Sequence, residues 1–186
     1  MAEALHFTGN EEADALLAQE PLALLIGFAL DQQVTVPTAF VGPLKLKQRL
    51  GTLEARDIAQ TDPSSLEAVF REKPAIHRFP GSMAGRVREL AAVVAEDYGG
   101  DASRIWREAK DTADLKGRLG ALPGFGEMKV TALGSVLARQ FGVEAAAPLA
   151  PGHACLGDVD SPQALADYQA AKRAHKAAMK AAPGRA

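Results

Sequence analysis

The chain has 186 residues and a mass of 19.5 kDa, which is the length of one compact domain and enough to bury a core without disulfides or a structural metal. Its only cysteine, Cys155, excludes a disulfide framework, a cysteine-based zinc site and a four-cysteine iron–sulfur cluster within this chain. The net charge of −2 is that of an ordinary soluble protein and, taken as a total, argues against a nucleic-acid partner.

Alanine accounts for 37 residues, whereas valine, isoleucine and threonine together account for 22. Because alanine favours helices and the β-branched residues favour strands, this composition predicts an all-α protein. No apolar run approaches the roughly 18 residues of a membrane span, and no basic stretch precedes an apolar one at the N-terminus. We therefore expect a cytoplasmic protein that does not contact a membrane.

Helices are predicted along most of the first half of the chain. They comprise a short amphipathic helix over 11–19, an apolar helix over 22–30, a helix from Pro37 to about Arg49, and two short helices with N-caps at Thr52 and Asp62. The helix over 22–30 is apolar on nearly every side, which is typical of a buried central helix. The segment 73–81 contains two prolines and is predicted to be a loop.

The helical pattern continues in the second half. One helix begins at Ser82 and stops at Gly99, another is capped by Asp111, a third runs from Glu127 to about Gln140, and a last one opens at Ser161. The stretch 142–160 is expected to be irregular. The sequence thus predicts roughly ten helices in a single domain over residues 1–186, without strands.

Positive and negative residues are segregated along the chain. Residues 1–44 contain six acidic residues and no lysine or arginine, whereas residues 161–186 contain five basic residues and one acidic residue. Segregated charge creates a directional field that the total charge conceals. A solvated helix face at each end of the chain also explains this pattern.

The most specific string is Leu122-Pro123-Gly124-Phe125-Gly126, which lies between two predicted helices. Two glycines one residue apart let the chain turn sharply and expose successive backbone N–H groups just before the helix that starts at Glu127. Exposed amides beside a helix N-terminus bind phosphate, whatever the sequence of the nucleic acid. An ordinary corner between two helices is the alternative, because glycine commonly ends a helix.

This string, followed by a helix, resembles the helix-hairpin-helix of the HhH-GPD superfamily of base-excision DNA glycosylases, which are related to endonuclease III. Two other segments agree with the family in the expected order: the apolar helix that runs into Asp31-Gln32-Gln33, and the loop around Gly81 and Ser82 before a long helix. The resemblance covers residues 20–142. It implies a helix-hairpin-helix bundle that binds double-stranded DNA, and we expect a monomer.

The resemblance implies that a glutamine, Gln32 or Gln33, enters the space left by an extruded base. An enzyme that acts on a base in a duplex must take it out of the stack, and a glutamine amide offers the widowed partner both a donor and an acceptor. Gly81 and Ser82 are expected to lie against DNA. Phosphate contacts near the hairpin are expected from Lys129, Arg86, Arg88 and Arg139. Solvent-facing roles for these residues are the alternative.

The sequence departs from the family at two catalytic positions. Bifunctional members carry a lysine on the helix after the hairpin, where this chain has Met128. Lys129 lies one residue later and about 100° further round the helix. A covalent lyase mechanism is therefore not expected, and the resemblance implies a monofunctional glycosylase. The aspartate that ends the family's conserved region is also missing from the window 144–150.

Four residues are candidates for the missing catalytic group. Breaking an N-glycosidic bond builds oxocarbenium-like positive charge, which a nearby carboxylate stabilises. Asp158 is the first candidate, followed by Glu144, Asp160 and His153, the last of these as a general base. A capping role for Asp160 and a structural role for His153 are the alternatives.

No metal site is predicted, and the single cysteine excludes the C-terminal iron–sulfur cluster that some family members carry. The resemblance implies that carbonyls of the hairpin hold a monovalent cation that helps to bind phosphate. The basic helix predicted over 161–186 stands in the place of the cluster. It either follows the DNA backbone or is a solvated terminal helix.

Three functions follow from these features. The first is a monofunctional DNA glycosylase of base-excision repair, which flips a damaged or mispaired base and hydrolyses its N-glycosidic bond. The second is a non-catalytic helix-hairpin-helix DNA-binding protein that has lost the catalytic aspartate. The third is a scaffold for protein–protein contacts, which the acidic N-terminal part of the chain would suit.

Overall fold

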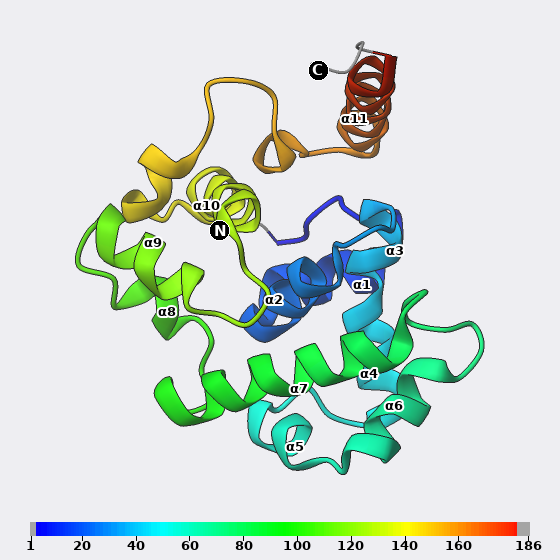
Figure 1. The fold of residues 1–186 in the computed structure, drawn as a ribbon. Coiled ribbons are helices and arrows are strands. Elements are labelled where there is room, and N and C mark those ends of the chain that lie inside the picture. The colour runs from blue at the N-terminus through cyan, green and yellow to red at the C-terminus, as the bar shows by residue number, and fades with distance from the viewer. Residues whose placement is uncertain (1–2, 182–186) are drawn as a thin grey trace, which may run out of the picture.

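The computed structural model describes residues 3–181, which form helices and loops without a β-strand. Eleven α-helices and two 3-10 helices follow one another along this part of the chain (Figure 1): α1 (Glu11–Gln19), α2 (Pro21–Leu30), α3 (Val36–Phe40), α4 (Gly42–Leu50), α5 (Ala55–Gln60), α6 (Pro63–Arg71), α7 (Pro80–Asp97), α8 (Arg104–Arg107), α9 (Thr112–Gly120), α10 (Glu127–Phe141), η1 (Glu144–Leu149), η2 (Leu156–Asp158) and α11 (Pro162–Ala181). The predicted all-α fold is confirmed.

Three predicted N-caps are present. The side chains of Asp62, Asp111 and Ser161 each accept a hydrogen bond from the backbone N–H three residues ahead, at 2.9, 2.8 and 3.1 Å respectively. Such bonds satisfy one of the N–H groups that a helix leaves without an internal partner. Helices α6, α9 and α11 therefore begin where short-range signals place them.

Two predicted helix boundaries between α2 and α6 are wrong. The helix expected from Pro37 to Arg49 consists of two helices, α3 and α4, which meet at Val41. Pro43 has no N–H to continue the hydrogen bonds of α3, so it opens a new helix instead. Thr52 does not cap α5: its hydroxyl accepts the Glu54 N–H at 3.0 Å, and the helix starts after Glu54.

The central helix α2 is buried along its length, as predicted, because every residue from Leu22 to Leu30 is buried. It packs against α1, α3, α4 and α7. Among the described residues no single helix has the length and apolar content to cross a membrane. Helices α1 and α2 reach this length and apolar content only when they are taken together, and they meet at a bend of 114°.

A glycine sets the spacing between α2 and α3. A Cβ at Gly27 would lie 2.5 Å from Cδ1 of Phe40, so only glycine lets the Phe40 ring approach the α2 backbone. The Phe40 ring in turn makes edge contacts with Phe7 and Phe28, with centroid separations of 5.1 and 5.0 Å. This packing holds α2 and α3, the two helices that flank the loop over residues 31–35, against each other.

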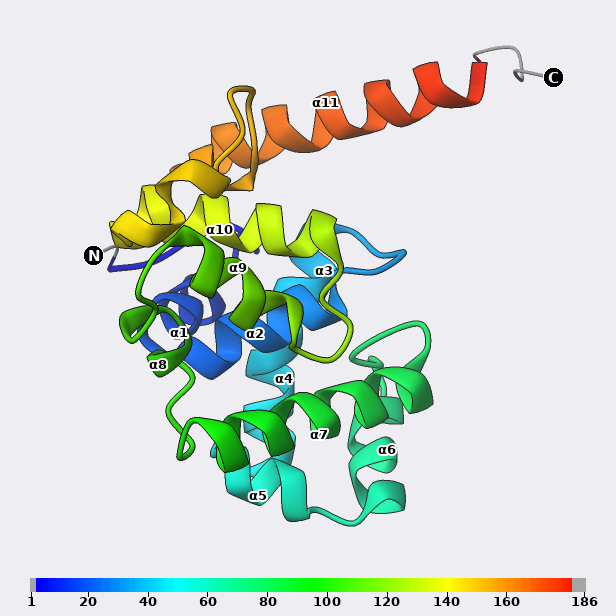
Figure 2. The same cartoon turned by 60° about the vertical axis from the view of Figure 1, so that its left-hand side comes forward.

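Helices α7 and α10 lie on opposite sides of α2 in both views (Figures 1 and 2). Helix α7 packs against α5 and α6, whereas α10 packs against α9, η1 and η2. The buried apolar side chains of both groups belong to one cluster that extends from Leu5 to Leu165. The two groups therefore share a core, and α2 lies between them.

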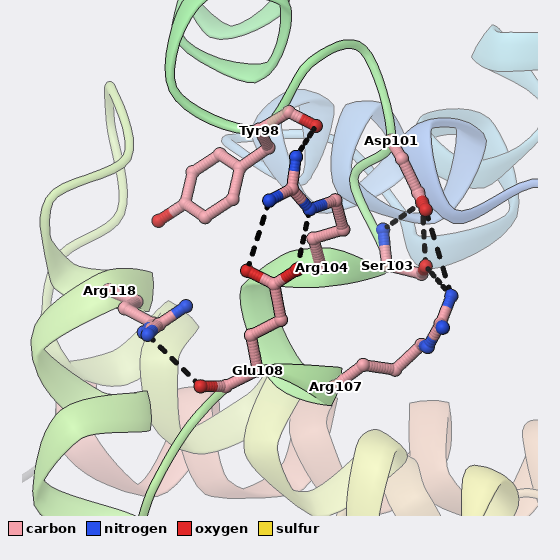
Figure 3. A network of polar contacts seen from close by, with 7 residues as sticks. All are labelled: Tyr98, Asp101, Ser103, Arg104, Arg107, Glu108 and Arg118. Carbon is pink, nitrogen blue, oxygen red and sulfur yellow. Dashed lines mark hydrogen bonds and ion pairs between the residues drawn. The ribbon is translucent and has the colours of Figure 1, made fainter.

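A polar network connects the end of α7 to α8 and α9 (Figure 3). Arg104 donates to the Tyr98 carbonyl at 3.2 Å and to the Glu108 carboxylate at 2.6 Å. Arg118 of α9 donates to the Glu108 carbonyl at 3.1 Å. Exposed ion pairs add little stability, and these contacts link the end of α7 to α9 by way of α8.

The last helix, α11, extends away from the rest of the molecule (Figure 2). Leu165 is its only buried residue, and residues 170–181 are all exposed. The sequence also assigns Arg185 to this basic terminal helix, but residues 182–186 lie outside the described part of the chain.

We expect Gly27→Ala to lower the free energy of unfolding by about 1–3 kcal/mol, because the added methyl group would displace the Phe40 ring. Helix propensity alone predicts the opposite, since alanine is more favourable than glycine by about 1 kcal/mol. Gly85→Ala in α7 is the matched control, because a Cβ there meets nothing within 4 Å. It should raise stability by about 0.5–1 kcal/mol. Urea denaturation measures both, and equal effects would contradict the close approach of Phe40.

Candidate functional site

The string Leu122–Gly126 forms the turn between α9 and α10, as predicted. Gly124 has a φ of +78°, and Gly126 is the N-cap of α10. Leu122 and Phe125 are buried and hold the turn against the core, whereas Gly124 and Gly126 are exposed. No side chain caps α10, so the N–H groups of its first turn remain available to a ligand.

An open cleft of about 650 Å³ lies against this turn. Its walls are the turn, the start of α10 and two residues from elsewhere, Gln32 of the α2–α3 loop and Arg86 of α7. Nη1 of Arg86 donates to Oε1 of Gln32 at 2.6 Å. A Cβ at Gly124 would lie 2.7 Å from Cδ of Arg86, so glycine is required here for the positive φ and for the space that Arg86 occupies.

The α2–α3 loop presents Gln32 and Gln33 at the surface. Gln33 has a φ of +57° and is the one non-glycine residue with a positive φ in the described part of the chain. This conformation costs roughly 1–2 kcal/mol for a residue with a Cβ. The Gln33 side chain has no hydrogen bond among the described residues. A strained backbone at an exposed polar side chain points to a function rather than to packing.

His77 joins the α2–α3 loop to the segment before α7. Its ring is buried, and Nε2–H donates to the carbonyls of Leu30 and Gln32, both at 3.1 Å. Nδ1 accepts the Phe79 N–H at 3.0 Å, which requires the neutral ring. Burial lowers the pKa of His77 below 6.5, the charges of Arg78 and Lys129 act in the same direction, and the two carbonyls oppose them. The sequence pattern did not single out His77, because one histidine in a predicted loop is not a specific motif.

Lys129 connects the start of α10 to the end of α2. Its Nζ donates to the Ala29 carbonyl at 3.1 Å and lies 5.9 Å from the centroid of the Phe125 ring. Burial lowers the pKa of Lys129, as does the charge of Arg86, whereas Asp31 raises it. The neighbouring Met128 is 88% exposed. Of the two positions, the structure therefore brings Lys129 into the polar cluster at the cleft.

Asp31 is a half-buried carboxylate at the end of α2, and sequence reasoning did not single it out. Its side chain has no hydrogen bond or ion pair among the described residues. Burial raises the pKa of Asp31, against the opposing charges of Lys172 and Lys129. Burial raises the pKa of Tyr168 in α11, and the negative charge of Asp31 raises it further. Only the approach of α10 and α11 distinguishes Asp31 from an ordinary polar loop residue.

The four predicted catalytic residues lie beyond the far end of α10, and none of them lines the cleft. Asp158 pairs with Arg139, which is about 18 Å along α10 from Glu127. Its carboxylate also accepts the Cys155 N–H at 2.9 Å. Partial burial raises the pKa of Asp158, but these two partners outweigh it and leave the pKa below its usual range. The remaining three are exposed: Glu144, His153 and Asp160.

Other predicted DNA contacts divide between the cleft and more distant positions. Gly81 and Ser82 lie in the first turn of α7, one turn before Arg86, rather than in a loop. Arg88 donates to the Thr61 carbonyl at 3.2 Å and belongs to the contact between α5 and α7. Arg139 donates to the Pro151 carbonyl at 2.9 Å and pairs with Asp158. Of the three predicted arginines, only Arg86 reaches the cleft.

Within residues 3–181, no group of three or more histidine, cysteine, aspartate or glutamate side chains is placed to hold a metal ion. Cys155 is buried and free. No family model, curated protein or solved structure matches the chain. The cleft is therefore interpreted from its own geometry.

The protonation of His77 should make stability depend on pH. Because its folded pKa is below 6.5, its contribution to stability is fully present above about pH 6.5 and is lost as pH falls toward the folded pKa. We expect the melting temperature to fall between about pH 7 and about pH 5.5. His77→Gln keeps a donor for the carbonyls but does not titrate, so its melting temperature should change less over this range. Identical pH profiles in calorimetry would contradict the role of His77.

Proposed function

We propose that this chain binds duplex DNA at the hairpin cleft and, as a monofunctional glycosylase of the HhH-GPD type, hydrolyses the N-glycosidic bond of a damaged or mispaired base. One observation carries the proposal: three segments far apart in the sequence meet around one cleft. They are the glycine turn, the loop with Gln32 and Gln33, and Arg86 of α7. Each of them supplies a part of what base excision requires.

The turn is suited to hold a phosphate. Gly124 and Gly126 leave the backbone open, and the uncapped N-terminus of the 15-residue α10 carries a partial positive charge. Arg86 and Lys129 add two positive charges at the wall of the cleft, which exceed the one negative charge of Glu127 there. Carbonyls of the hairpin that hold a monovalent cation are part of the same proposal. Such contacts position DNA without reading its sequence.

Gln33 is suited to fill the gap that an extruded base leaves. Extrusion costs a few kcal/mol, and a side chain that replaces the base recovers part of this. Gln33 is exposed, and the link between His77 and the Gln32 carbonyl holds the neighbouring backbone. The strained φ of Gln33 is therefore set before DNA binds, which lowers the entropy lost on binding.

Asp31 is the carboxylate that the geometry favours for stabilising the cationic sugar. It precedes Gln32 directly, and Lys129 extends from the hairpin helix to the carbonyl of Ala29, two residues earlier. Since no group of the described chain binds its carboxylate, Asp31 is free to act on a substrate. Asp158, the first choice from the sequence, is already bound to Arg139 and Cys155.

A non-catalytic DNA-binding protein is the second candidate. The observation that favours it is that Asp31 and the four predicted catalytic residues are all absent from the lining of the cleft. In that case the turn and Arg86 still hold DNA, and no group acts on the sugar.

We expect Gly126→Ala to weaken duplex binding about tenfold or more, because a methyl group would obstruct one charge-assisted contact worth about 1.5–3 kcal/mol. The variant should fold as stably as the parent, since its φ is −79° and a Cβ meets nothing within 4 Å. Gly117→Ala, on the exposed side of α9, is the matched control and should bind normally. Fluorescence anisotropy with several unrelated duplexes measures both. Normal binding by folded Gly126→Ala would mean that the turn is structural only.

We expect excision from at least one duplex in a panel that carries uracil, alkylated bases, hypoxanthine or mispaired 8-oxoguanine, with alkali used to reveal abasic sites. Asp31→Asn should slow single-turnover excision by about 10²–10³-fold while duplex binding is kept. Asp158→Asn should leave excision unchanged and lower the melting temperature, because it weakens the contact with Arg139. Loss of excision in Asp158→Asn alone would restore the sequence-based assignment. No excision from any duplex, with binding intact, would support the non-catalytic alternative.

A further inference from the structure

The second half of α11 is an exposed helix with its positive charges on one face. Residues 170–181 contain no acidic residue and four lysines or arginines: Lys172, Arg173, Lys176 and Lys180. At 3.6 residues per turn these four fall within an arc of about 100°. We call this arc the basic face of α11.

The basic face continues the side of α11 that packs against the protein. Leu165, the one buried residue of the helix, lies about 20° from Lys172 in projection down the helix axis. Nζ of Lys172 lies 5.9 Å from the centroid of the half-buried Tyr168 ring. The charge of Lys172 also lowers the pKa of Asp31 at the end of α2. The basic face is therefore turned toward the body of the protein rather than away from it.

Helix α11 begins near the end of α2 and extends away from the rest of the molecule, on the side of the hairpin turn. Figure 2 shows α11 running antiparallel to α10, with its C-terminal half projecting on the side of the hairpin turn and the α2–α3 loop. From Leu165 to Lys180 the helix rises about 22 Å. Its basic face thus begins near Asp31 and continues outward from the body of the protein on that side.

Asp31 is close enough to Lys172 for their charges to interact, but it forms no ion pair with it. No ion pair involves Lys172, Arg173, Lys176 or Lys180 among residues 3–181. Like charges at i and i+4 destabilise an isolated helix, and a helix of this length without a packing partner is marginal in water. A regularly spaced polyanion laid on this face would remove both penalties.

We propose that the basic face of α11 is a second binding surface for the DNA backbone, and that it contacts phosphates other than those bound at the hairpin. The inference rests on the proposed DNA binding. Lys172, Lys176 and Lys180 span about 12 Å, over which one DNA strand carries roughly three to four phosphates. The match in charge and in spacing identifies the backbone of the same duplex as the partner.

The test compares two variants that differ in where the charges lie. In the first, Lys172, Arg173, Lys176 and Lys180 are each replaced by glutamine, which keeps helix propensity. The second adds Ala170→Lys, Ala174→Lys, Ala178→Lys and Ala181→Lys to these changes, which restores the net charge on the opposite face of the helix. Circular dichroism checks that both remain helical. Duplex affinity is measured as a function of salt concentration.

Each phosphate contact contributes about 0.9 to the slope of log K against log salt. The glutamine variant should therefore lose up to about 3.6 of this slope, and the opposite-face variant should behave like it rather than like the parent. A slope equal to that of the parent in either variant would overturn the proposed second binding surface and leave the proposed hairpin site unaffected. Failure of the parent to bind duplex DNA would instead overturn the proposed function itself.

Sedimentation velocity tests whether the basic face binds the acidic surface of a second copy of this chain instead of DNA. A parent that forms dimers, which dissociate in the glutamine variant, would show that the basic face binds the acidic surface of a second copy. That result would also overturn the proposal. We expect the parent and both variants to sediment as monomers without DNA.

Discussion

Helix α2 ends inside the protein, and its last carbonyl groups must find hydrogen-bond donors there, because the helix itself supplies none for them. Lys129 of α10 donates to Ala29, and His77, just before α7, donates to Leu30. Both donors come from segments more than 40 residues away in the sequence. Satisfying the end of one buried helix thus draws α10 and the start of α7 to the same point, and that point is where the candidate site forms.

The contact between Arg86 and Gly124 then closes the wall of the cleft. Arg86 belongs to the group of helices around α7, whereas Gly124 belongs to the hairpin of α9 and α10. Gln32, which binds Arg86, lies on the loop that leaves α2. The cleft is therefore a junction between two helical groups, and its width depends on how α7 and α10 are held against α2.

Features that depend on neighbouring residues could be read from the sequence. The caps at Asp62 and Asp111 and the glycine turn of Leu122–Gly126 are set within a few residues, so they were predicted correctly. The break at Pro43 was missed because a proline suits the first turn of a helix as well as its interruption.

Features that depend on distant residues could not be read in this way. Arg86 and Gln32 are 54 residues apart, and no local pattern pairs them. Asp158 and Asp31 are both carboxylates in polar runs, and only the tertiary structure shows that Asp158 has two partners while Asp31 has none among the described residues. The sequence therefore predicted the turn, Gln32 and Arg86 but neither His77 nor Asp31, and the folded chain determines which charges face one another.

The left-handed backbone of Gln33 has a consequence for how the protein can be altered. Glycine or asparagine would occupy this conformation at a lower energy, so a search for thermal stability alone would replace this glutamine early. Natural proteins are seldom at their stability optimum, and stabilising changes at strained positions are often made at the expense of activity. Engineering this chain for heat resistance by relaxing its backbone would therefore begin by replacing Gln33, the side chain that we propose to fill the space left by an extruded base.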